Sequence, residues 1–280
     1  MSIFVIGARG YIGTSLLLAA KQQGPATGTS STEAPGLVPL NLGAPEDFDY
    51  SLLSASDTVL LTAAISAPDV CANEYDYANS VNVIGTTSFI KKAIASGARV
   101  IFFSSDTIYG EQEQLVDEHA VCNPAGEYAQ MKRAVEVEFE SNASFKAIRL
   151  SYVFSKDDKY TRYLTACANK GEAAEVFDPF KRSVIHREDV VDAAISLALH
   201  WDDFPEQIIN FGGPDVLSRV DMAEALKSGV FADLKIDIVD PGEAFFENRP
   251  KIISMNSPVQ SRLLGRPPTS FCEAISKEFN

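Results

Sequence analysis

A tyrosine and a lysine four residues apart, Tyr128 and Lys132, have side chains suited to acid–base chemistry. They lie in a segment, 127–140, whose pattern predicts a helix, and residues i and i+4 share one face of a helix. A cation beside a phenol favours the phenolate, so we expect Lys132 to lower the pKa of Tyr128. Such a tyrosine could act as a general acid or base near neutral pH. The spacing alone is not specific, because Tyr152 and Lys156 repeat it.

Three glycines near the N-terminus form a Gly-x-x-Gly-x-x-Gly pattern between an expected strand, 3–6, and an expected helix, 12–22. The pattern is a variant of the dinucleotide-binding fingerprint. Glycines let the backbone turn tightly and approach a pyrophosphate, which binds at the helix N-terminus. A plain glycine turn is the alternative, but the position between strand and helix favours a cofactor site. The residues predicted to contact the cofactor here are Gly7, Arg9, Gly10, Tyr11, Ile12 and Gly13.

The residues about 20 positions after the glycine loop determine the choice between NAD and NADP. In NAD enzymes an acidic residue there hydrogen-bonds the ribose 2′-hydroxyl. This chain instead has Thr27-Gly-Thr-Ser-Ser-Thr32, with no acidic residue before Glu33. Hydroxyls can donate to a 2′-phosphate, and Arg9 could supply positive charge. We therefore expect NADP(H) to be preferred, with NAD(H) as the alternative. The expected cofactor contacts in this segment are Thr29, Ser30 and Ser31.

Short apolar runs alternate with longer amphipathic segments through the first 150 residues. The expected strands are 3–6, 38–40, 58–62, 100–103 and 147–150, and the expected helices are 12–22, a segment within 69–96, and 127–140. This alternation predicts an α/β fold with a doubly wound parallel sheet of the Rossmann type. Its ligand crevice is expected at the carboxyl ends of the strands.

The alternation breaks after residue 150, where pairs of proline and glycine separate the segments. Helices are expected at 160–170, 190–199 and 220–227, and a strand at 207–211. We predict an NAD(P)-binding Rossmann domain over residues 1–150. Residues 151–280 are predicted to form mainly a smaller C-terminal substrate-binding lobe, with some segments returning to the Rossmann core.

Composition excludes several classes of protein. The net charge of −14 argues against binding to nucleic acid or to an anionic membrane. No apolar run approaches the roughly 18 residues of a membrane helix, and the N-terminus lacks the basic region of a signal peptide. The four cysteines are scattered without a Cys/His cluster, so neither a metal site nor a disulfide framework is indicated. We expect a cytoplasmic protein with a small-molecule substrate.

Further motifs follow one another in a specific order. They are Thr62-Ala63-Ala64-Ile65-Ser66, Asn82-Val-Ile-Gly85-Thr86, Ser104-Ser105-Asp106-Thr107-Ile108-Tyr109-Gly110, Tyr128-x-x-x-Lys132, Arg149-Leu150-Ser151, Arg182-x-x-x-His186-x-x-Asp189 and Asn210-Phe-Gly-Gly213. With the glycine loop, this order resembles the extended short-chain dehydrogenase/reductases, in the NAD(P)-dependent epimerase/dehydratase group. The tail, Arg249-Pro250 to Leu263-Leu-Gly265, is similar to that of dTDP-4-dehydrorhamnose reductases.

The resemblance implies a catalytic role for three residues. Tyr128 would exchange a proton with a substrate carbonyl or alcohol, and Lys132 would hold the nicotinamide ribose. Ser105 would hydrogen-bond the substrate oxygen, although a one-residue change of register would bring in Ser104 instead. Hydride would pass between nicotinamide C4 and the carbonyl carbon. The Tyr152/Lys156 pair lies outside the matching helix and is interpreted as a chance match in a loop.

The resemblance also implies binding residues. The expected additional cofactor contacts are Ala63, Ala64 and Asn82, and the expected substrate contacts are Ser66, Asp106, Arg182 and Arg249. Sugar-nucleotide 4,6-dehydratases of the family carry an Asp-Glu pair where this chain has Asp106-Thr107, which counts against dehydratase chemistry. The segment Ser151-Tyr-Val-Phe-Ser155 departs from the family's Asn-x-Tyr-Gly-Pro pattern, so substrate recognition there does not carry over.

The leading hypothesis is an NADP(H)-preferring oxidoreductase that reduces a carbonyl of a nucleotide-sugar or a related compound. An NAD-retaining nucleotide-sugar epimerase is the first alternative, favoured by the Asn82 motif and opposed by the missing acidic residue. A catalytically silent NADP-binding regulatory subunit or redox sensor is the second, opposed by the presence of both Tyr128 and Lys132. The resemblance further implies a homodimer formed through the helices that hold Asn82 and Tyr128.

Overall fold

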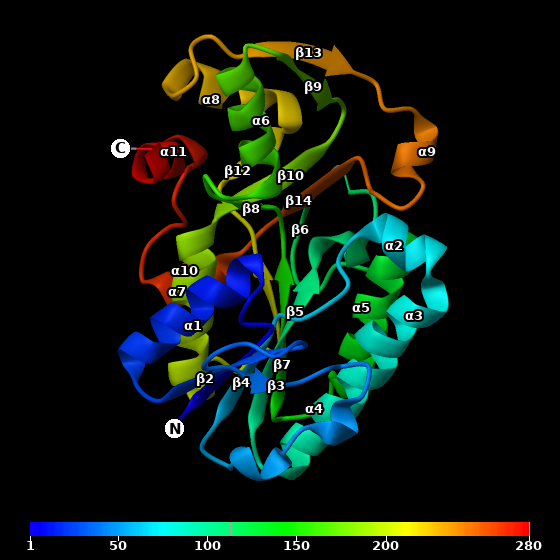
Figure 1. The fold of residues 1–280 in the computed structure, drawn as a ribbon, viewed down its shortest axis with the longest axis vertical. Helices are drawn as coiled ribbons and strands as arrows, with labels where there is room; N and C mark the ends of the chain where they lie inside the picture. The colour runs from blue at the N-terminus through cyan, green and yellow to red at the C-terminus, as the bar shows by residue number, and fades with distance from the viewer. Residues whose placement is uncertain (113, 280) are drawn as a thin grey trace.

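The centre of the fold is a seven-stranded sheet in the order β11-β7-β5-β4-β1-β2-β3, in which all neighbouring strands are parallel (Figure 1). The computed structural model describes residues 1–112 and 114–279. The strands are β1 (Ile3–Ile6), β2 (Ala26–Ser30), β3 (Val38–Pro39), β4 (Thr58–Leu61), β5 (Arg99–Ser105), β7 (Phe145–Leu150) and β11 (Ile208–Phe211). The chain order reverses between β1 and β4, which opens a crevice at the carboxyl ends. The predicted Rossmann-type α/β fold is confirmed.

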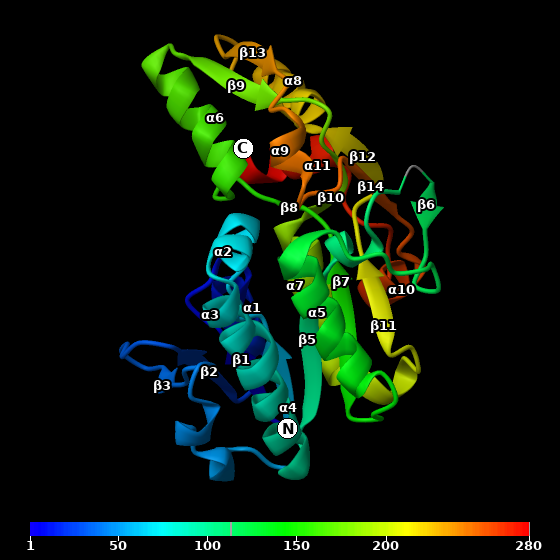
Figure 2. The same cartoon turned by 90° about the vertical axis from the view of Figure 1, so that its right-hand side faces the viewer.

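Helices cover both faces of this sheet, as Figures 1 and 2 show. One face carries α1 (Tyr11–Gln23), α7 (Arg187–Leu199) and α10 (Pro258–Leu264), and the other carries α2 (Pro68–Asn73), α3 (Tyr75–Asn79), α4 (Thr86–Ala95) and α5 (Gly126–Phe139). Side chains alternate between the two faces of a strand. In β1, Ile3 and Val5 accordingly join the core under α1 and α7, whereas Phe4 and Ile6 join the core under α4 and α5.

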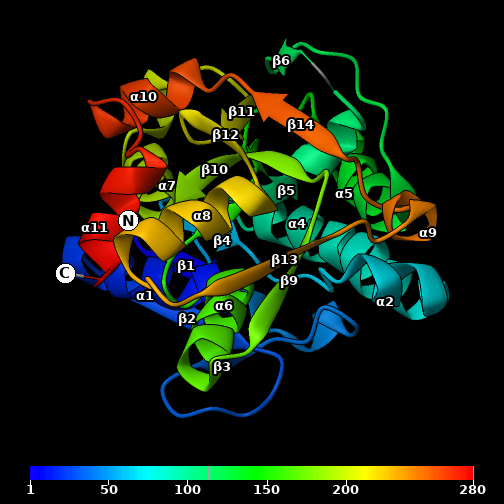
Figure 3. The ribbon, with the colours of Figure 1, turned by 90° about the horizontal axis from the view of Figure 1, so that it is seen from above.

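A second group of elements lies above the carboxyl ends of the large sheet (Figures 1 and 3). Its strands are β6 (Leu115–Val116), β8 (Val153–Phe154), β9 (Ala173–Phe177), β10 (Lys181–His186), β12 (Asp215–Ser218), β13 (Lys235–Val239) and β14 (Ile252–Met255). Its helices are α6 (Lys159–Lys170), α8 (Arg219–Gly229), α9 (Glu243–Phe246) and α11 (Phe271–Phe279). Strand β10 lies between β12 and β14 and also pairs with β8, whereas β9 and β13 form a separate ribbon. A separate apolar core lies beneath α6, α8 and α11.

Two local expectations needed correction. The hydroxyl-rich segment 27–32, where no strand was expected, is partly strand β2, and the single helix expected within 69–96 is divided into α2, α3, a π-helical turn η3 (Ser80–Gly85) and α4. Short 3-10 turns complete the chain at η1 (Pro45–Asp47), η2 (Tyr50–Leu52), η4 (Asp106–Tyr109) and η5 (Trp201–Asp203). Over residues 1–112 and 114–279, no helix is both long and apolar enough to traverse a bilayer. The same residues hold no cluster of potential metal ligands.

Candidate active site

The glycine loop between β1 and α1 brings backbone groups to the carboxyl edge of the sheet. Gly7 has a φ of +89°, a conformation that favours glycine. A Cβ at Gly13 would lie 2.2 Å from the carbonyl oxygen of Gly7, so a side chain there would push the helix away from the loop. The close approach leaves the N-terminus of α1 open toward the crevice, where it can bind a phosphate.

A cleft of about 670 Å³ runs along this loop and the strand ends. Most of the predicted cofactor contacts line it: Gly7, Arg9, Gly10, Tyr11, Ile12, Gly13, Thr29, Ser30, Ser31, Ala63, Ala64, Tyr128 and Lys132. Ser66, predicted to contact substrate, also lines the cleft. The lining residues not predicted as contacts are Thr32, Thr62, Phe103 and Leu150, and Ser104 was named only as the alternative to Ser105. Thr62 directly follows a strand and Leu150 ends one, so their position at strand ends was a usable signal.

The far end of the cleft is rich in hydroxyl groups. Arg9 donates a hydrogen bond of 2.9 Å from Nη1 to the hydroxyl of Thr32. The Thr29 hydroxyl accepts a long hydrogen bond of 3.4 Å from the amide of Gly7, and this contact joins β2 to the glycine loop. One cation and a group of hydroxyls therefore meet where β2 ends.

Lys132 is buried inside the cleft wall. Only 3% of the residue is exposed, and its ammonium donates a 2.7 Å hydrogen bond to the carbonyl oxygen of Phe103. The ammonium also lies 4.5 Å from the ring centre of Phe102 and 5.8 Å from that of Tyr128. Burial lowers the pKa of Lys132 to about 8, and the carboxylate of Glu136 opposes that fall.

The expected lowering of the Tyr128 pKa is wrong in this structure. Burial raises the pKa of Tyr128 above its ordinary value, and the neighbouring ionisable groups of Cys71 and Asp106 add to the rise. Lys132 does not offset this, because its ammonium is hydrogen-bonded to Phe103 rather than to the phenol. The phenol is therefore protonated at neutral pH.

The two adjacent serines at the end of β5 have different surroundings. The cleft lining in the described chain includes Ser104 rather than Ser105. Among the described residues, the buried Ser104 hydroxyl has no hydrogen-bond partner. The Ser105 hydroxyl lies 2.9 Å from that of Thr107 and donates to Asp106 over 3.3 Å. A cofactor or substrate atom could satisfy Ser104 without breaking an existing hydrogen bond.

Asp106 and Arg182 form a buried pair between the two parts of the molecule. Arg182 Nε lies 3.5 Å from Asp106 Oδ2, and Arg182 Nη2 donates a 2.7 Å hydrogen bond to the carbonyl oxygen of Pro250. The Ser151 hydroxyl donates a 3.0 Å hydrogen bond to Asp106. Burial raises the pKa of Asp106, and Arg182 opposes the rise. Neither Asp106 nor Arg182 is among the described residues that line the cofactor cleft.

The remaining predicted residues lie at the edges of the site. Asn82 makes two hydrogen bonds with the backbone of Ile65, of 2.8 and 2.9 Å, and so fixes the loop that follows β4. Asn82 itself is not among the described residues that line the cleft. Arg249 pairs with Asp69 of α2 at 2.6 Å, likewise outside that lining. The pair interpreted as a chance match in a loop instead flanks the short strand β8, and Tyr152 donates a hydrogen bond to Asp158.

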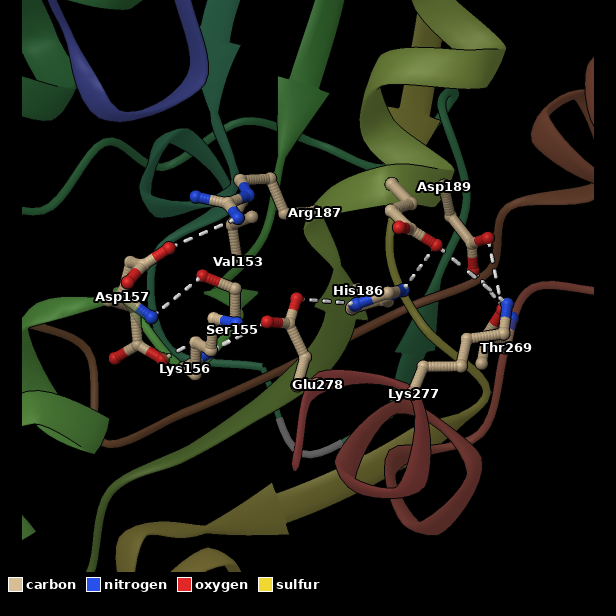
Figure 4. Close-up of polar contacts among 12 residues, drawn as sticks. Val153, Ser155, Lys156, Asp157, His186, Arg187, Asp189, Thr269, Lys277 and Glu278 are labelled. Carbon is tan, nitrogen blue, oxygen red and sulfur yellow. Dashed lines mark hydrogen bonds and ion pairs between the residues drawn. The ribbon is translucent and has the colours of Figure 1, made fainter. Parts of the chain in front are cut away.

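Tyr11 connects the glycine loop to the upper part of the molecule. Its hydroxyl donates a 2.7 Å hydrogen bond to Ser155, and its ring lies beneath the guanidinium of Arg187 at 5.2 Å. Figure 4 shows how the last helix supports this region. Glu278 of α11 lies 2.9 Å from Nε2 of the buried His186 and accepts a 3.2 Å hydrogen bond from the amide of Lys156. Asp189 accepts hydrogen bonds from the amide and the hydroxyl of Thr269, just before α11, so the His186 and Asp189 motif anchors the C-terminal helix.

The residues of this cleft fit a dinucleotide. A glycine loop opens a helix, hydroxyl residues contribute to the lining, and the lining includes Ser104, whose buried hydroxyl has no partner among the described residues. Tyr128 and Lys132 would lie beside the nicotinamide end, and Arg9 with Thr32 beside the adenosine end.

Comparison with known proteins agrees with this arrangement. UDP-glucuronic acid decarboxylase 3 of Arabidopsis thaliana is 28% identical over 178 residues, which cover 57% of this chain and 51% of that protein. The chain thus spans about half the length of the curated relatives it matches.

Solved structures match over nearly the whole chain. UDP-glucose-4-epimerase from Stenotrophomonas maltophila, solved with NAD and formylated UDP-arabinopyranose, has a TM-score of 0.86 at 18% identity and covers 99% of this chain and 96% of its own. A hypothetical dTDP-4-dehydrorhamnose reductase from Sulfolobus tokodaii has a TM-score of 0.83 at 21% identity, with coverage of 95% and 96%. Identity at this level shows the fold alone.

The model of the NAD dependent epimerase/dehydratase family matches residues 3–212, which include the glycine loop, both serines and the Tyr128/Lys132 pair. The predicted resemblance to the extended short-chain dehydrogenase/reductases is therefore confirmed, and this chain belongs to the NAD dependent epimerase/dehydratase family.

Proposed function

We propose that this protein is an NADP(H)-preferring oxidoreductase that reduces a carbonyl group of a nucleotide-sugar or a related compound. The observation that carries the proposal is that Tyr128 and Lys132 line the same cleft as the glycine loop. A proton donor and a dinucleotide site in one cleft are what carbonyl reduction requires.

The protonated state of Tyr128 fits a reduction, in which the tyrosine donates a proton. A buried phenol that stays protonated at neutral pH is suited to donate its proton to a developing alkoxide. A bound nicotinamide supplies the hydride in that direction. Lys132, held by Phe103, would donate its remaining hydrogens to the ribose hydroxyls. Ser105 would orient the substrate oxygen, and Ser104 offers an unsatisfied hydroxyl beside it.

The end of β2 supports NADP(H). Arg9 and Thr32 are already hydrogen-bonded to each other in the cleft lining, close to Ser30 and Ser31. An arginine and several hydroxyls suit a phosphate better than a free 2′-hydroxyl. A carboxylate in their place would repel the phosphate, and β2 ends without one.

The upper part of the molecule supports a nucleotide-sugar. Phe177 and Phe180 meet Phe245 edge-on, with ring centres 5.0 and 6.0 Å apart. Arg182 stacks over Phe180 at 4.3 Å and Arg249 over Phe245 at 4.6 Å. Aromatic faces suit a planar base, and guanidinium groups suit a diphosphate. Binding would require Arg249 to exchange Asp69 for the diphosphate.

An NAD-retaining nucleotide-sugar epimerase is the second candidate, and the family match supports it equally. An epimerase returns the hydride to the same sugar intermediate and keeps its cofactor bound. A reductase releases the oxidised cofactor after each turnover. The purified protein is therefore tested for bound dinucleotide by denaturation and chromatography. Tightly held NAD in stoichiometric amount favours the epimerase, and a protein free of nucleotide that binds added NADPH favours the reductase.

The catalytic assignment is tested by Tyr128→Phe, which keeps the ring and removes only the hydroxyl group. Turnover of a substrate identified from a nucleotide-sugar panel is expected to fall about 1,000-fold, while NADPH binding stays within about twofold. Unchanged turnover in this variant would show that Tyr128 is not the acid. Wild-type protein that binds NADPH but turns over no member of the panel would instead favour the silent NADP-binding subunit.

We further propose a homodimer formed through η3, α4 and α5, which lie side by side in Figure 2. These elements and the adjoining α3 expose apolar side chains on the outside of the molecule: Tyr77 is 58%, Ile84 62% and Val137 50% exposed. Lys91 of α4 pairs with Glu138 of α5 beside them. Large exposed apolar side chains on adjacent helices suit a second copy of the same surface.

A further inference from the structure

Arg219, the first residue of α8, carries a positive charge that no carboxylate of the described chain balances. Its Nη1 atom is buried and has no hydrogen-bond partner among the described residues. The ion pairs within residues 1–112 and 114–279 do not include it. A buried donor without a partner is costly, and more so when it is charged. In a chain of net charge −14, this cation is therefore a candidate for binding an anionic ligand.

Three aromatic rings surround the guanidinium of Arg219. Its central carbon lies 4.2 Å from the ring centre of Tyr152, 4.2 Å from that of Tyr160 and 5.5 Å from that of Phe180. The Tyr160 hydroxyl also donates a 2.8 Å hydrogen bond to the carbonyl oxygen of Arg219. Attraction to ring faces does not occupy the in-plane N–H groups, which are the ones that bind an oxyanion. The rings thus hold the cation while its hydrogens stay available.

The carboxylate that contacts this ring cluster is engaged elsewhere. Asp158 is the N-cap of α6 and accepts hydrogen bonds from the amides of Tyr160 and Thr161, of 2.9 and 3.0 Å. It also accepts a hydrogen bond from the Tyr152 hydroxyl. Asp158 therefore stabilises the start of α6 and does not pair with Arg219.

Arg182 brings a second positive charge to the same cluster. Its guanidinium carbon lies 4.3 Å from the ring centre of Phe180. However, its Nη2 is bonded to a backbone carbonyl, and its Nε lies 3.5 Å from Asp106. Of these two arginines, Arg219 is the one with hydrogens to offer. Asp106 directly follows Ser105, so the cluster lies close to the reacting end of the candidate active site.

We propose that Arg219 binds an anionic oxygen group of the substrate, either a phosphate or a carboxylate, and thereby selects anionic carbonyl compounds. A guanidinium suits such groups because it can donate to two oxygens at once. The residue is only half-buried, so a ligand can approach it from the surface. The inference rests on the proposed function in that it takes the ligand to be the substrate. It adds a residue that lay outside the motifs used in the sequence analysis.

The test observes Arg219 itself and needs no turnover. Protein with ¹⁵N-labelled arginine is titrated by NMR with inorganic pyrophosphate, UDP, UDP-glucose and UDP-glucuronic acid at millimolar concentration, and Arg219→Met identifies the Nε–H signal. If Arg219 binds phosphate, pyrophosphate and UDP are expected to shift this signal. If it binds a carboxylate, UDP-glucuronic acid alone is expected to do so. A signal that none of the four probes shifts overturns the inference.

A pair of variants separates a specific site from a general effect of charge. Arg219→Met keeps an apolar stem between the rings, and the affinity for the probe that shifts the signal is expected to fall about tenfold. NADPH affinity should stay within about twofold. The matched control is Lys227→Met, which removes a positive charge from the last turn of the same helix and should change neither affinity. Equal losses of probe affinity in both variants would overturn the inference.

Arg219→Lys is read in the same way if the methionine variant does not fold. It keeps the charge but loses the planar pair of donors, so a loss of probe affinity of several-fold is expected. Unchanged affinity in this folded variant would also count against the inference.

Kinetics distinguish this inference from the proposed function. A shifted Arg219 signal in a protein that reduces no nucleotide-sugar with NADPH supports the anion site and contradicts the reductase. Conversely, reduction of a nucleotide-sugar with a KM that Arg219→Met leaves unchanged supports the reductase and overturns the inference.

Discussion

The ammonium of Lys132 is bonded to the carbonyl oxygen of Phe103 at 2.7 Å, whereas the ring centre of Tyr128 lies 5.8 Å away. The lysine of the pair is thus fixed by the central strand β5 rather than by the tyrosine. Two roles were expected for Lys132: to lower the pKa of Tyr128 and to hold the nicotinamide ribose. The first is not seen, because the phenol stays protonated, and the second remains a proposal.

Cofactor affinity should depend on the protonation of Lys132. Because burial lowers its pKa to about 8, the lysine is charged below that pH and neutral above it. We expect NADPH binding to weaken several-fold between about pH 7 and about pH 9. The measurement is the dissociation constant from nicotinamide fluorescence across this range. Lys132→Met is expected to bind weakly at every pH, and a variant that kept the wild-type pH dependence would contradict the assignment.

Arg9 should determine the choice of cofactor. Arg9→Ala removes the cation at the end of β2, so NADPH affinity is expected to fall about tenfold, or about 1.4 kcal/mol. NADH affinity should change by less than about twofold. The control is Lys21→Ala, because Lys21 is an exposed cation in the last turn of α1. Equal losses for both cofactors would place Arg9 against the pyrophosphate instead.

Substitutions of the two serines at the end of β5 should have different kinetic effects. Ser105→Ala is expected to lower kcat about 100-fold by removing a donor to the substrate oxygen. Ser104→Ala is expected mainly to weaken cofactor binding, because Ser104 lines the cleft and its buried hydroxyl has no partner among the described residues. Steady-state kinetics with both substrates varied checks this. The opposite pattern would exchange the two roles.

The C-terminal helix should contribute stability through Glu278. In Glu278→Gln, the weaker contacts to His186 and to the Lys156 amide are expected to reduce the free energy of unfolding by about 1–3 kcal/mol. The measurement is the urea midpoint. Glu273→Gln, an exposed residue of the same helix, should change it little. A midpoint that moves equally in both variants would contradict a specific role for the contacts in Figure 4.

A charge at Ile84 should prevent dimer formation. Ile84→Glu places a carboxylate on the proposed dimer surface, so light scattering after size-exclusion chromatography is expected to report a monomer. The control is Leu18→Glu, because Leu18 is 61% exposed on α1 and lies outside this surface. A dimer that persists in Ile84→Glu would show that the interface lies on another surface.

The Rossmann part was largely predictable from the sequence because its central strands β1, β4, β5 and β7 are buried on both faces. Ile3–Ile6 and the other apolar runs are recognisable without knowledge of their neighbours. Strand β2 is different, since Ala26–Ser30 consists of small and hydroxyl residues and is a strand only because it pairs with β1. Its sequence alone resembles a loop.

The upper part was less predictable because its strands are short and depend on distant partners. Val153 and Phe154 form a strand through Ile185 and His186, and β6 forms through β14 across more than 130 residues of chain. The pKa of Tyr128 was mispredicted for a related reason. Helix spacing places Lys132 near the phenol, but the burial that raises the pKa comes from the tertiary structure.

The path of the chain between the two parts has a mechanical consequence. After β7 the chain leaves the large sheet for β8, α6 and β10, returns for α7 and β11, leaves again for β12 to β14, and returns for α10 before α11. The two parts are therefore joined by several separate backbone crossings rather than by one linker. Any opening of the cleft must bend all of these crossings together, which favours small sliding movements over a wide swing about one hinge.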